Sequence, residues 1–367
     1  MKSLGRVDAT KRLLLEELRV TEQMLASAAT KESRRYCDAQ ITTLPDLGLP
    51  YNVRRMHGGF FTGACYQWES DVPLVPIDAT VNVCGVSIFR TDIDISSAEH
   101  FRERIDHAKN ALAETTPFVW NFTSGHHFII LAESDGAGTL PAGRYIVLHA
   151  STAEFKAQFN GLYPGPTNWY SDAVKTLDGE NGRYLRYLAG RPAEEFYRTA
   201  SMLESYQRER QRICAALVVG NRHLQEEILS LPHYGMPDQA SVAIGCQWVS
   251  PASADYVLLT RPRGPIFLLR AREGGSNTLN TMNGERLLAP HGLGVRAEHE
   301  LTLGRTAETL VVSGQQFPLE SSLVDAPIAT IREFDREETM REVTAACPSD
   351  IEAELVQIHA YFRTGTL

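Results

Sequence analysis

The chain has 367 residues, enough to bury one large hydrophobic core or two smaller ones. An apolar content of 43%, a charged content of 22% and a net charge of −9 are typical of a globular protein and exclude a uniformly basic nucleic-acid binder. A local basic groove is still compatible with that net charge. The six cysteines form no disulfide framework for a chain of this length, and no apolar segment is long enough to span a membrane. We therefore expect a cytoplasmic protein with neither a signal peptide nor a membrane segment.

The first predicted element is an N-terminal helix over residues 8–29, where leucines recur at helical spacing and Asp8 is the expected N-cap. Residues 38–74 are irregular and rich in strand-forming residues, and they contain a glycine-rich loop. Residues 75–91 form two apolar runs that meet at Cys84, which is followed by a glycine. This pattern predicts two buried strand pieces joined at a sharp bend, with the thiol near the lip of a sheet.

A second helix is expected after Ser96, which forms a capping-box pattern with Glu99. Strands are predicted over residues 128–132 and 144–149, and a long loop over residues 160–182, which are rich in Gly, Pro, Asn and Asp.

The second half of the chain begins with a predicted helix over residues 193–231, broken near Gly220. Strands dominate residues 241–312, and two helices are expected from Asp335 to the end.

Strands and helices alternate without a regular βαβ order, so we predict a single α+β domain with a central, mostly antiparallel sheet layer and helices outside. Residues 1–40 are expected to form an N-terminal helical segment, and residues 41–367 the main domain.

Three histidine sites lie beside glycines: the pair His126–His127 before a strand, His149 at a strand end, and His291 at the head of a glycine turn. A single histidine or cysteine in such a place is more often a structural residue than a ligand. Glycines, however, let the backbone approach a ligand closely, as metal and phosphate sites require. We expect Cys84, His127 and His149 to converge at one end of a cleft.

Taken together, these segments resemble the RtcB family of RNA ligases, in the same order from about Met56 onward. The matching segments are 81–91, 125–128, 149–154, 182–212, 245–249, 262–265, 291–295 and 325–329. The resemblance implies an RtcB-like catalytic domain. It also implies that a histidine attacks GTP to form a histidine–GMP intermediate, with Mn²⁺ as the metal. GMP then passes to an RNA 3′-phosphate (or 2′,3′-cyclic phosphate) end, and a 5′-hydroxyl end displaces it.

The resemblance also implies roles for individual residues. By position, His291 would be the nucleophile. The metal ligands would be Cys84, His127, His149 and Cys246, with Asp78 as a further acidic candidate. The nucleotide would contact His126, Arg263, Gly292, Gly294, Arg296 and Arg363. Two thiolates and two imidazoles would also suit tetrahedral Zn²⁺.

The chain departs from the family pattern at several of these sites. The metal-binding Asp falls on Val81, the guanine-binding Glu on Ile130, and two arginines fall on Ala153 and Val295. Two hypotheses therefore stay open. One is a working RNA ligase, which His291 in its glycine turn favours. The other is a catalytically silent relative that binds RNA ends, a metal or a protein partner.

Overall fold

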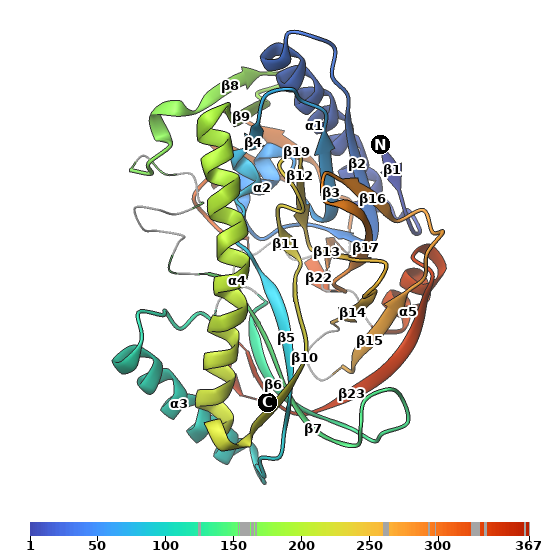
Figure 1. Cartoon of the computed structure of the whole chain (residues 1–367). Coiled ribbons are helices and arrows are strands. Elements are labelled where there is room, and N and C mark those ends of the chain that lie inside the picture. Colours follow the sequence, from blue (N-terminus) through green and yellow to red (C-terminus); the bar gives the residue numbers. More distant parts are fainter. Residues whose placement is uncertain are drawn as a thin grey trace.

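The computed structural model describes residues 1–123, 126–152, 154, 162, 165, 167–259, 264–292, 294–297, 299–323, 331–333, 336–362 and 365–366. These residues form an α+β fold of mainly antiparallel sheets with helices packed outside them (Figure 1), which confirms the predicted α+β class. The strands form several separate sheets and not the single central layer that was predicted.

The largest sheet is antiparallel throughout and occupies the lower half of Figure 1. In spatial order it contains β10 (Leu224–Pro232), β5 (Gly85–Thr91), β7 (Gly143–Ala150), β6 (Phe128–Ser134), β23 (Ser349–Phe362), β15 (Ile266–Ala271) and β14 (Asp255–Leu258), with β24 (Gly365–Thr366) beside β23. Alternate residues of its strands enter two cores, so that Phe89 packs toward helices and the adjacent Ile88 toward β14 and β15. Both faces are buried, which explains the nearly continuous apolar runs in the sequence.

A second sheet lies in the upper half of Figure 1 and contains β1 (Lys2–Ser3), β2 (Ala39–Gly48), β3 (Thr62–Trp68), β12 (Ser241–Ile244) and β11 (Tyr234–Gly235). The smaller sheets are β4 (Leu74–Pro76) with β9 (Tyr184–Ala189) and β8 (Lys175–Asp178); β13 (Cys246–Val249) with β17 (Gly284–Pro290) and β16 (Thr278–Thr281); β19 (Leu303–Arg305) with β20 (Thr309–Val312) and β21 (Gln315–Pro318); and β18 (Val295–Ala297) with β22 (Ile331–Glu333).

The α-helices are α1 (Ala9–Ser33), α2 (Val53–Gly58), α3 (Ala98–Thr115), α4 (Arg191–Val219) and α5 (Arg336–Ala346), and short 3₁₀ turns are η1 (Ile77–Ala79), η3 (Ser171–Ala173) and η4 (Asn221–His223). Asp8 caps α1 as predicted and accepts a hydrogen bond from the Lys11 amide at 2.7 Å. The cap of α3 is Ser97, one residue later than expected. In the described part of the chain, no helix is both long and apolar enough to cross a membrane.

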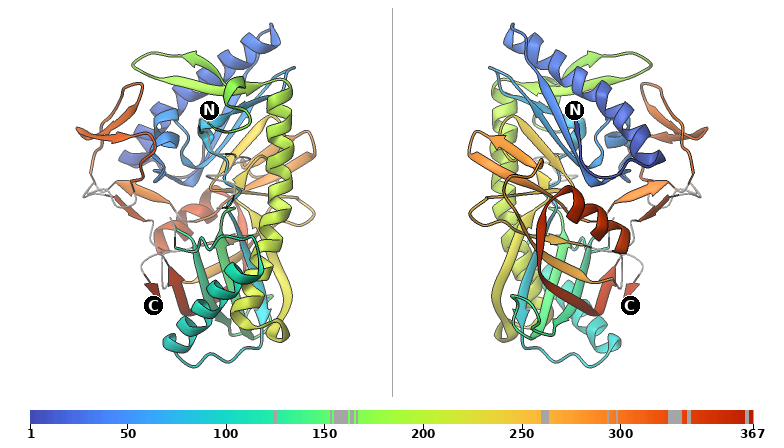
Figure 2. Two further views of the ribbon diagram at one scale, coloured as in Figure 1. Left: turned by 90° about the vertical axis from the view of Figure 1, so that its left-hand side faces the viewer. Right: turned by 90° about the vertical axis from the view of Figure 1, so that its right-hand side faces the viewer.

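Helix α4 runs along the molecule from the β8–β9 hairpin to α3 (Figure 1). The two side views in Figure 2 place α1 and the largest sheet at opposite ends of the molecule, with α4 bordering both. Leucines of α1, including Leu14 and Leu18, share one core with residues of α4 such as Phe196. The N-terminal helical segment therefore packs into the same core as the main domain.

Two predictions of helix were wrong. Helix α4 ends at Val219, before Gly220 with φ +89°. The short turn η4 follows, and then β10, which pairs with β5. Near the C-terminus, α5 is followed by the long strand β23 instead of a second helix. In β23 the buried Ala353 and Leu355 alternate with glutamates, and this period of two is the pattern of a strand.

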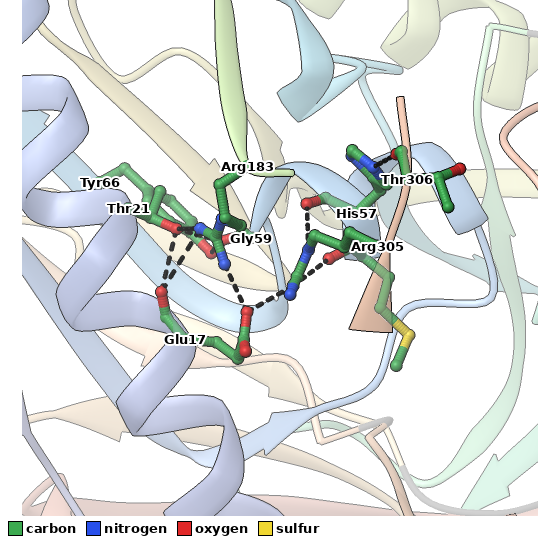
Figure 3. A network of polar contacts seen from close by, with 9 residues as sticks. Glu17, Thr21, His57, Gly59, Tyr66, Arg183, Arg305 and Thr306 are labelled. Atoms are coloured by element: carbon green, nitrogen blue, oxygen red, sulfur yellow. Dashed lines mark hydrogen bonds and ion pairs between the residues drawn. The ribbon is translucent and has the colours of Figure 1, made fainter. Parts of the chain in front are cut away.

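A buried ion-pair network ties α1 to the rest of the fold (Figure 3). The Glu17 carboxylate accepts hydrogen bonds from Arg183 and Arg305, whose side chains are both 5% exposed. Arg183 also donates to Thr21 Oγ1 at 2.6 Å, and Arg305 donates to the His57 carbonyl in α2 at 2.9 Å. Burial, and then the nearby Arg305, lower the pKa of Arg183 to about 10, so this arginine still carries its charge at neutral pH.

Replacing the shared carboxylate should be costly. We expect Glu17→Ala to lower the free energy of unfolding by about 3–5 kcal/mol, because it leaves two guanidinium groups buried without their partner. Denaturant unfolding measures this change. The matched control is Asp350→Ala, which removes the partner of Arg272 from a pair 47% and 62% exposed; there we expect a loss of less than about 1 kcal/mol. Equal effects of the two substitutions would contradict the role given to Glu17.

Candidate metal centre

Cys84 is placed by a bend that differs from the predicted one. The chain turns at Thr80 and Val83, which have φ of +48° and +51°, and not at Gly85. Gly85 serves another purpose: a Cβ there would lie 2.9 Å from the Leu231 carbonyl oxygen in β10. Glycine therefore allows β10 to pair closely with the strand that begins directly after Cys84.

Four neighbouring strands bring four potential ligands to one edge of the largest sheet. In the order β10, β5, β7 and β6, these residues are His233, Cys84, His149 and His127. The register aligns them, because Gly85 pairs with Pro232 and Ala150, and Phe128 pairs with His149. Each ligand thus belongs to a different strand end.

The side chains at this edge are close enough to share an ion. Cys84 Sγ lies 3.3 Å from Nε2 of His127 and 3.3 Å from Nε2 of His149. His149 Nε2 is 3.0 Å from His233 Nε2. Atoms bound tetrahedrally to one zinc-sized cation lie about 3.3 to 3.8 Å apart, given metal–ligand bonds of about 2.0–2.3 Å. The buried group of Cys84, His149 and His233 could hold a metal ion, and His127 directly adjoins it.

Hydrogen bonds at the outer ring nitrogens favour the tautomers that bind metals. His127 Nδ1 donates to the Asn121 carbonyl at 2.7 Å, and His149 Nδ1 donates to the His126 carbonyl at 3.1 Å. These bonds leave the lone pair of each Nε2 directed at Cys84. Several converging lone pairs repel one another unless protons or a cation lie between them, so the donor set fits a bound metal.

Burial keeps the imidazoles in the form that binds metals. Burial, followed by repulsion from His291 and His126, lowers the pKa of His149 to about 3. Burial also lowers the pKa of His233 well below its ordinary value. Both rings are therefore neutral at pH 7 and can bind a metal without first losing a proton.

The same shift predicts how acid affects the metal-free protein. The unfolded chain takes up a proton on His149 near pH 6.5, whereas the folded chain does so only near pH 3. The unfolded state binds more protons in this window, so stability falls as the pH falls. Between pH 7 and pH 5 we expect His149 alone to account for a loss of about 2 kcal/mol. Urea unfolding in the presence of a chelator measures the profile, and His149→Gln should flatten it by that amount. A profile that His149→Gln leaves unchanged would contradict the prediction.

His291 lies beside the metal group and is fixed by a buried carboxylate. Its ring centroid is 5.1 Å from that of His233, and its Nδ1 lies 2.8 Å from Asp46 Oδ2. The same oxygen accepts hydrogen bonds from the backbone N–H groups of His291 and Gly292. The predicted glycine turn is present, because Gly292 has φ +90° and a Cβ there would lie 2.1 Å from the Leu259 carbonyl oxygen.

These groups line a cavity of about 300 Å³. Its walls include Cys84, His126, His127, His149, His233, His291, Tyr51, Asn52, Arg55, Asn82 and Tyr234. The guanidinium of Arg55 stacks on the Tyr234 ring, 4.8 Å from the ring centroid. The cavity therefore combines potential metal ligands with a cation and several neutral hydrogen-bonding groups.

Two expected metal ligands lie elsewhere. The Cys246 thiol donates to the Ile244 carbonyl at 3.5 Å and packs with Cys65 and other buried residues in a separate core. Burial raises its pKa well above the ordinary value, so the thiol stays protonated. Asp78 forms ion pairs with Arg186, whose Nε lies 3.0 Å from Asp78 Oδ2, and with Arg54. An acid already paired with two arginines has little charge left for a metal.

Of the expected nucleotide-binding residues, some lie at the cavity and others lie away from it. His126 lines the cavity, with its ring 4.8 Å from that of Tyr51, and Gly292 lies in the turn after His291. Gly294 is buried directly before β18. Arg296 is directed toward α1, where it forms an ion pair with Asp8 at 3.5 Å. Arg263 and Arg363 lie outside the described residues.

Two residues of the site escaped the sequence analysis. His233 comes two residues after the predicted helix over residues 193–231, and recognising Leu224–Pro232 as a strand would have placed it at a strand end like the other histidines. Asp46 stands among apolar residues, Leu44 and Leu47, and is 1% exposed. A lone carboxylate in an apolar stretch is a signal for a buried partner, although it does not identify that partner.

Comparison of the sequence with models of protein families and with curated proteins yields no match. The assignment of a function therefore rests on the residues and their geometry.

Proposed function

We propose that this protein is a metal-dependent RNA ligase similar to the RtcB family. In this proposal it joins an RNA 3′-phosphate or 2′,3′-cyclic phosphate end to a 5′-hydroxyl end through a histidine–GMP intermediate. The observation that carries the proposal is the position of His291, which adjoins the metal group and is held by Asp46. A histidine nucleophile that acts on a phosphate beside a metal needs this arrangement.

Asp46 prepares His291 for attack on phosphorus. With the Nδ1 proton donated to the carboxylate, Nε2 carries the lone pair that serves as the nucleophile. Nε2 would form a bond to the α-phosphorus of GTP while the bond from that phosphorus to the diphosphate oxygen breaks. The imidazole becomes positively charged as the bond forms, and the Asp46 carboxylate stabilises that charge, as a carboxylate does in a Ser–His–Asp triad.

Cys84, His127, His149 and His233 would hold the metal, which supplies positive charge against the transferring phosphoryl group. His233 takes the place that the resemblance assigned to Cys246. One thiolate and three imidazoles suit Zn²⁺ on ligand chemistry, whereas the resemblance implies Mn²⁺. We propose a divalent transition-metal ion, and elemental analysis of the protein as isolated identifies it.

In this proposal the cavity takes the phosphate groups of GTP and of the RNA ends. Its volume of about 300 Å³ is at the lower end of the range for small-molecule sites. Arg55 supplies a guanidinium suited to phosphate oxygens, and Asn52 and Asn82 supply further hydrogen-bonding groups at the wall.

A cytoplasmic location stays a prediction.

The test is covalent labelling. The protein incubated with α-phosphate-labelled GTP and Mn²⁺ or Zn²⁺ should acquire a label that acid removes and alkali does not, as expected for a phosphorus–nitrogen bond. An RNA with a 3′-phosphate and a 5′-hydroxyl end should then discharge the label and be joined. A protein that holds its metal but takes no label under either condition would contradict the proposal.

A second function is favoured by the burial of two apolar residues at positions that the resemblance assigns to acidic ones. The residue at the position of the guanine-binding Glu, Ile130, is 1% exposed and packs in the core of the largest sheet. The residue at the position of the metal-binding Asp, Val81, is buried in another core. Both substitutions suit a catalytically silent relative that binds RNA ends, a metal or a protein partner. Retention of 3′-phosphate RNA without any label from GTP would support this second function.

A further inference from the structure

Helix α4 buries polar side chains where an amphipathic helix normally buries apolar ones. Gln207, Arg210 and Gln211 are 3%, 0% and 1% exposed. Their spacing places all three on one side of the helix, and we call them the polar face of α4. One and two turns later, the same side of the helix carries the buried apolar residues Cys214 and Val218. Buried amides and guanidinium groups are costly unless each is hydrogen-bonded, so their partners indicate what the polar face is for.

The two glutamines hydrogen-bond the backbone of the residues that directly follow two metal ligands in the sequence. Gln211 Nε2 donates to the Gly85 carbonyl at 2.9 Å, and Gly85 follows Cys84. Gln207 Nε2 donates to the Ala150 carbonyl at 2.6 Å, and Ala150 follows His149. Gly85 and Ala150 face each other across β5 and β7. The two amides thus fix both members of the residue pair next to Cys84 and His149.

Arg210 is linked to the third ligand, His127, through hydrogen bonds to Glu154 and to the segment that contains Asn121. Its Nε donates to Glu154 Oε1 at 2.9 Å, and the same oxygen accepts the Val119 N–H at 2.6 Å. Arg210 also donates to the Val119 carbonyl. Two residues further along, the Asn121 carbonyl accepts the Nδ1 proton of His127 at 2.7 Å. The segment that sets the ring orientation of His127 is therefore bonded to the same face of α4.

We propose that the polar face of α4 positions the metal group, with Gln207, Arg210 and Gln211 acting as positioning residues for Cys84, His127 and His149. If this side of the helix served stability alone, apolar residues would be sufficient there. Here each polar group reaches a different segment that carries a ligand, and one rigid helix thereby sets the spacing of three strand ends. This inference rests on the metal group used in the proposed function and does not depend on RNA ligation.

The test uses two variants of the full-length chain, Gln211→Met and Gln207→Met, which keep the side-chain volume and remove the amide. The control is Asn277→Leu, because Asn277 is 0% exposed and donates to the Leu288 carbonyl at 2.8 Å, away from the ligand-bearing strand ends. Each protein is titrated with Co²⁺ against a competing chelator, and its thiolate-to-cobalt absorption band is recorded. Thermal unfolding of the metal-free forms shows how much stability each substitution removes.

We expect both glutamine variants to bind Co²⁺ about 10- to 100-fold more weakly and to show a shifted or weakened thiolate band. Asn277→Leu should lose comparable stability but keep the parent affinity and band. Should Gln211→Met fail to fold, Gln207→Met and the milder Gln211→Asn, which shortens the reach of the amide, decide the question. Parent-like affinity and absorption in the folded glutamine variants would overturn the proposal while leaving the metal group intact. A parent protein that binds no Co²⁺ through a thiolate would overturn both this proposal and the metal group of the proposed function.

Discussion

His291→Ala is expected to abolish covalent labelling by GTP, reducing its rate to below about one-thousandth of the parent rate, while leaving bound metal and fold unchanged. The reason is that no other group replaces the attacking nitrogen once the ring is gone. The group of Cys84, His149 and His233, with His127 beside Cys84, does not include His291, so the metal group does not depend on it. The measurement is label incorporation over time, together with the metal content and thermal unfolding of the variant.

Two further variants make this experiment specific. Asp46→Asn removes the carboxylate that holds Nδ1, so labelling should slow by about 100- to 10,000-fold yet still occur at His291. His107→Ala, at an exposed position in α3, should label at the parent rate. If His291→Ala accepts the label as fast as the parent does, the assignment of the nucleophile is wrong. If no form of the protein takes a label, the catalytically silent relative is the better description.

Cys84→Ala should weaken metal binding by more than about 100-fold, whereas Cys246→Ala should leave it unchanged. Loss of a direct ligand should exceed the 10- to 100-fold loss typical of an outer-shell partner. Cys84 Sγ contacts two imidazoles, while the Cys246 thiol is directed at a backbone carbonyl in a separate core. Metal titration of the two variants, with elemental analysis of the parent, makes the comparison.

Alkylation gives an independent readout of the same centre. A bound cation should shield the Cys84 thiolate, so a chelator should increase alkylation at Cys84 as measured by mass spectrometry of peptides. Cys246 is 0% exposed and its thiol stays protonated, so it should react slowly with or without the chelator. Chelator-independent reactivity at Cys84 would indicate a core cysteine and remove the basis for the metal centre.

The sequence alone was sufficient for features set by neighbouring residues. The helix cap at Asp8, the break at Gly220 and the glycine turn after His291 depend on local backbone conformation, and all three are present. The same holds for the strand ends near His127 and His149, where apolar runs meet polar residues. These signals also predicted that the two histidines would approach Cys84, because neighbouring antiparallel strands end at a common edge.

Only the tertiary structure decided which further residues complete the site. His233 reaches Cys84 because β10 folds back onto β5, whereas the sequence had predicted a helix up to residue 231. Asp46 meets His291 from 245 residues away in the sequence, and no local pattern encodes such a contact. Cys246 and Asp78 have the chemistry of ligands, but packing turns one thiol into a separate core and pairs the carboxylate with arginines. Residue type and spacing therefore identified candidates, whereas long-range strand pairing and burial selected among them.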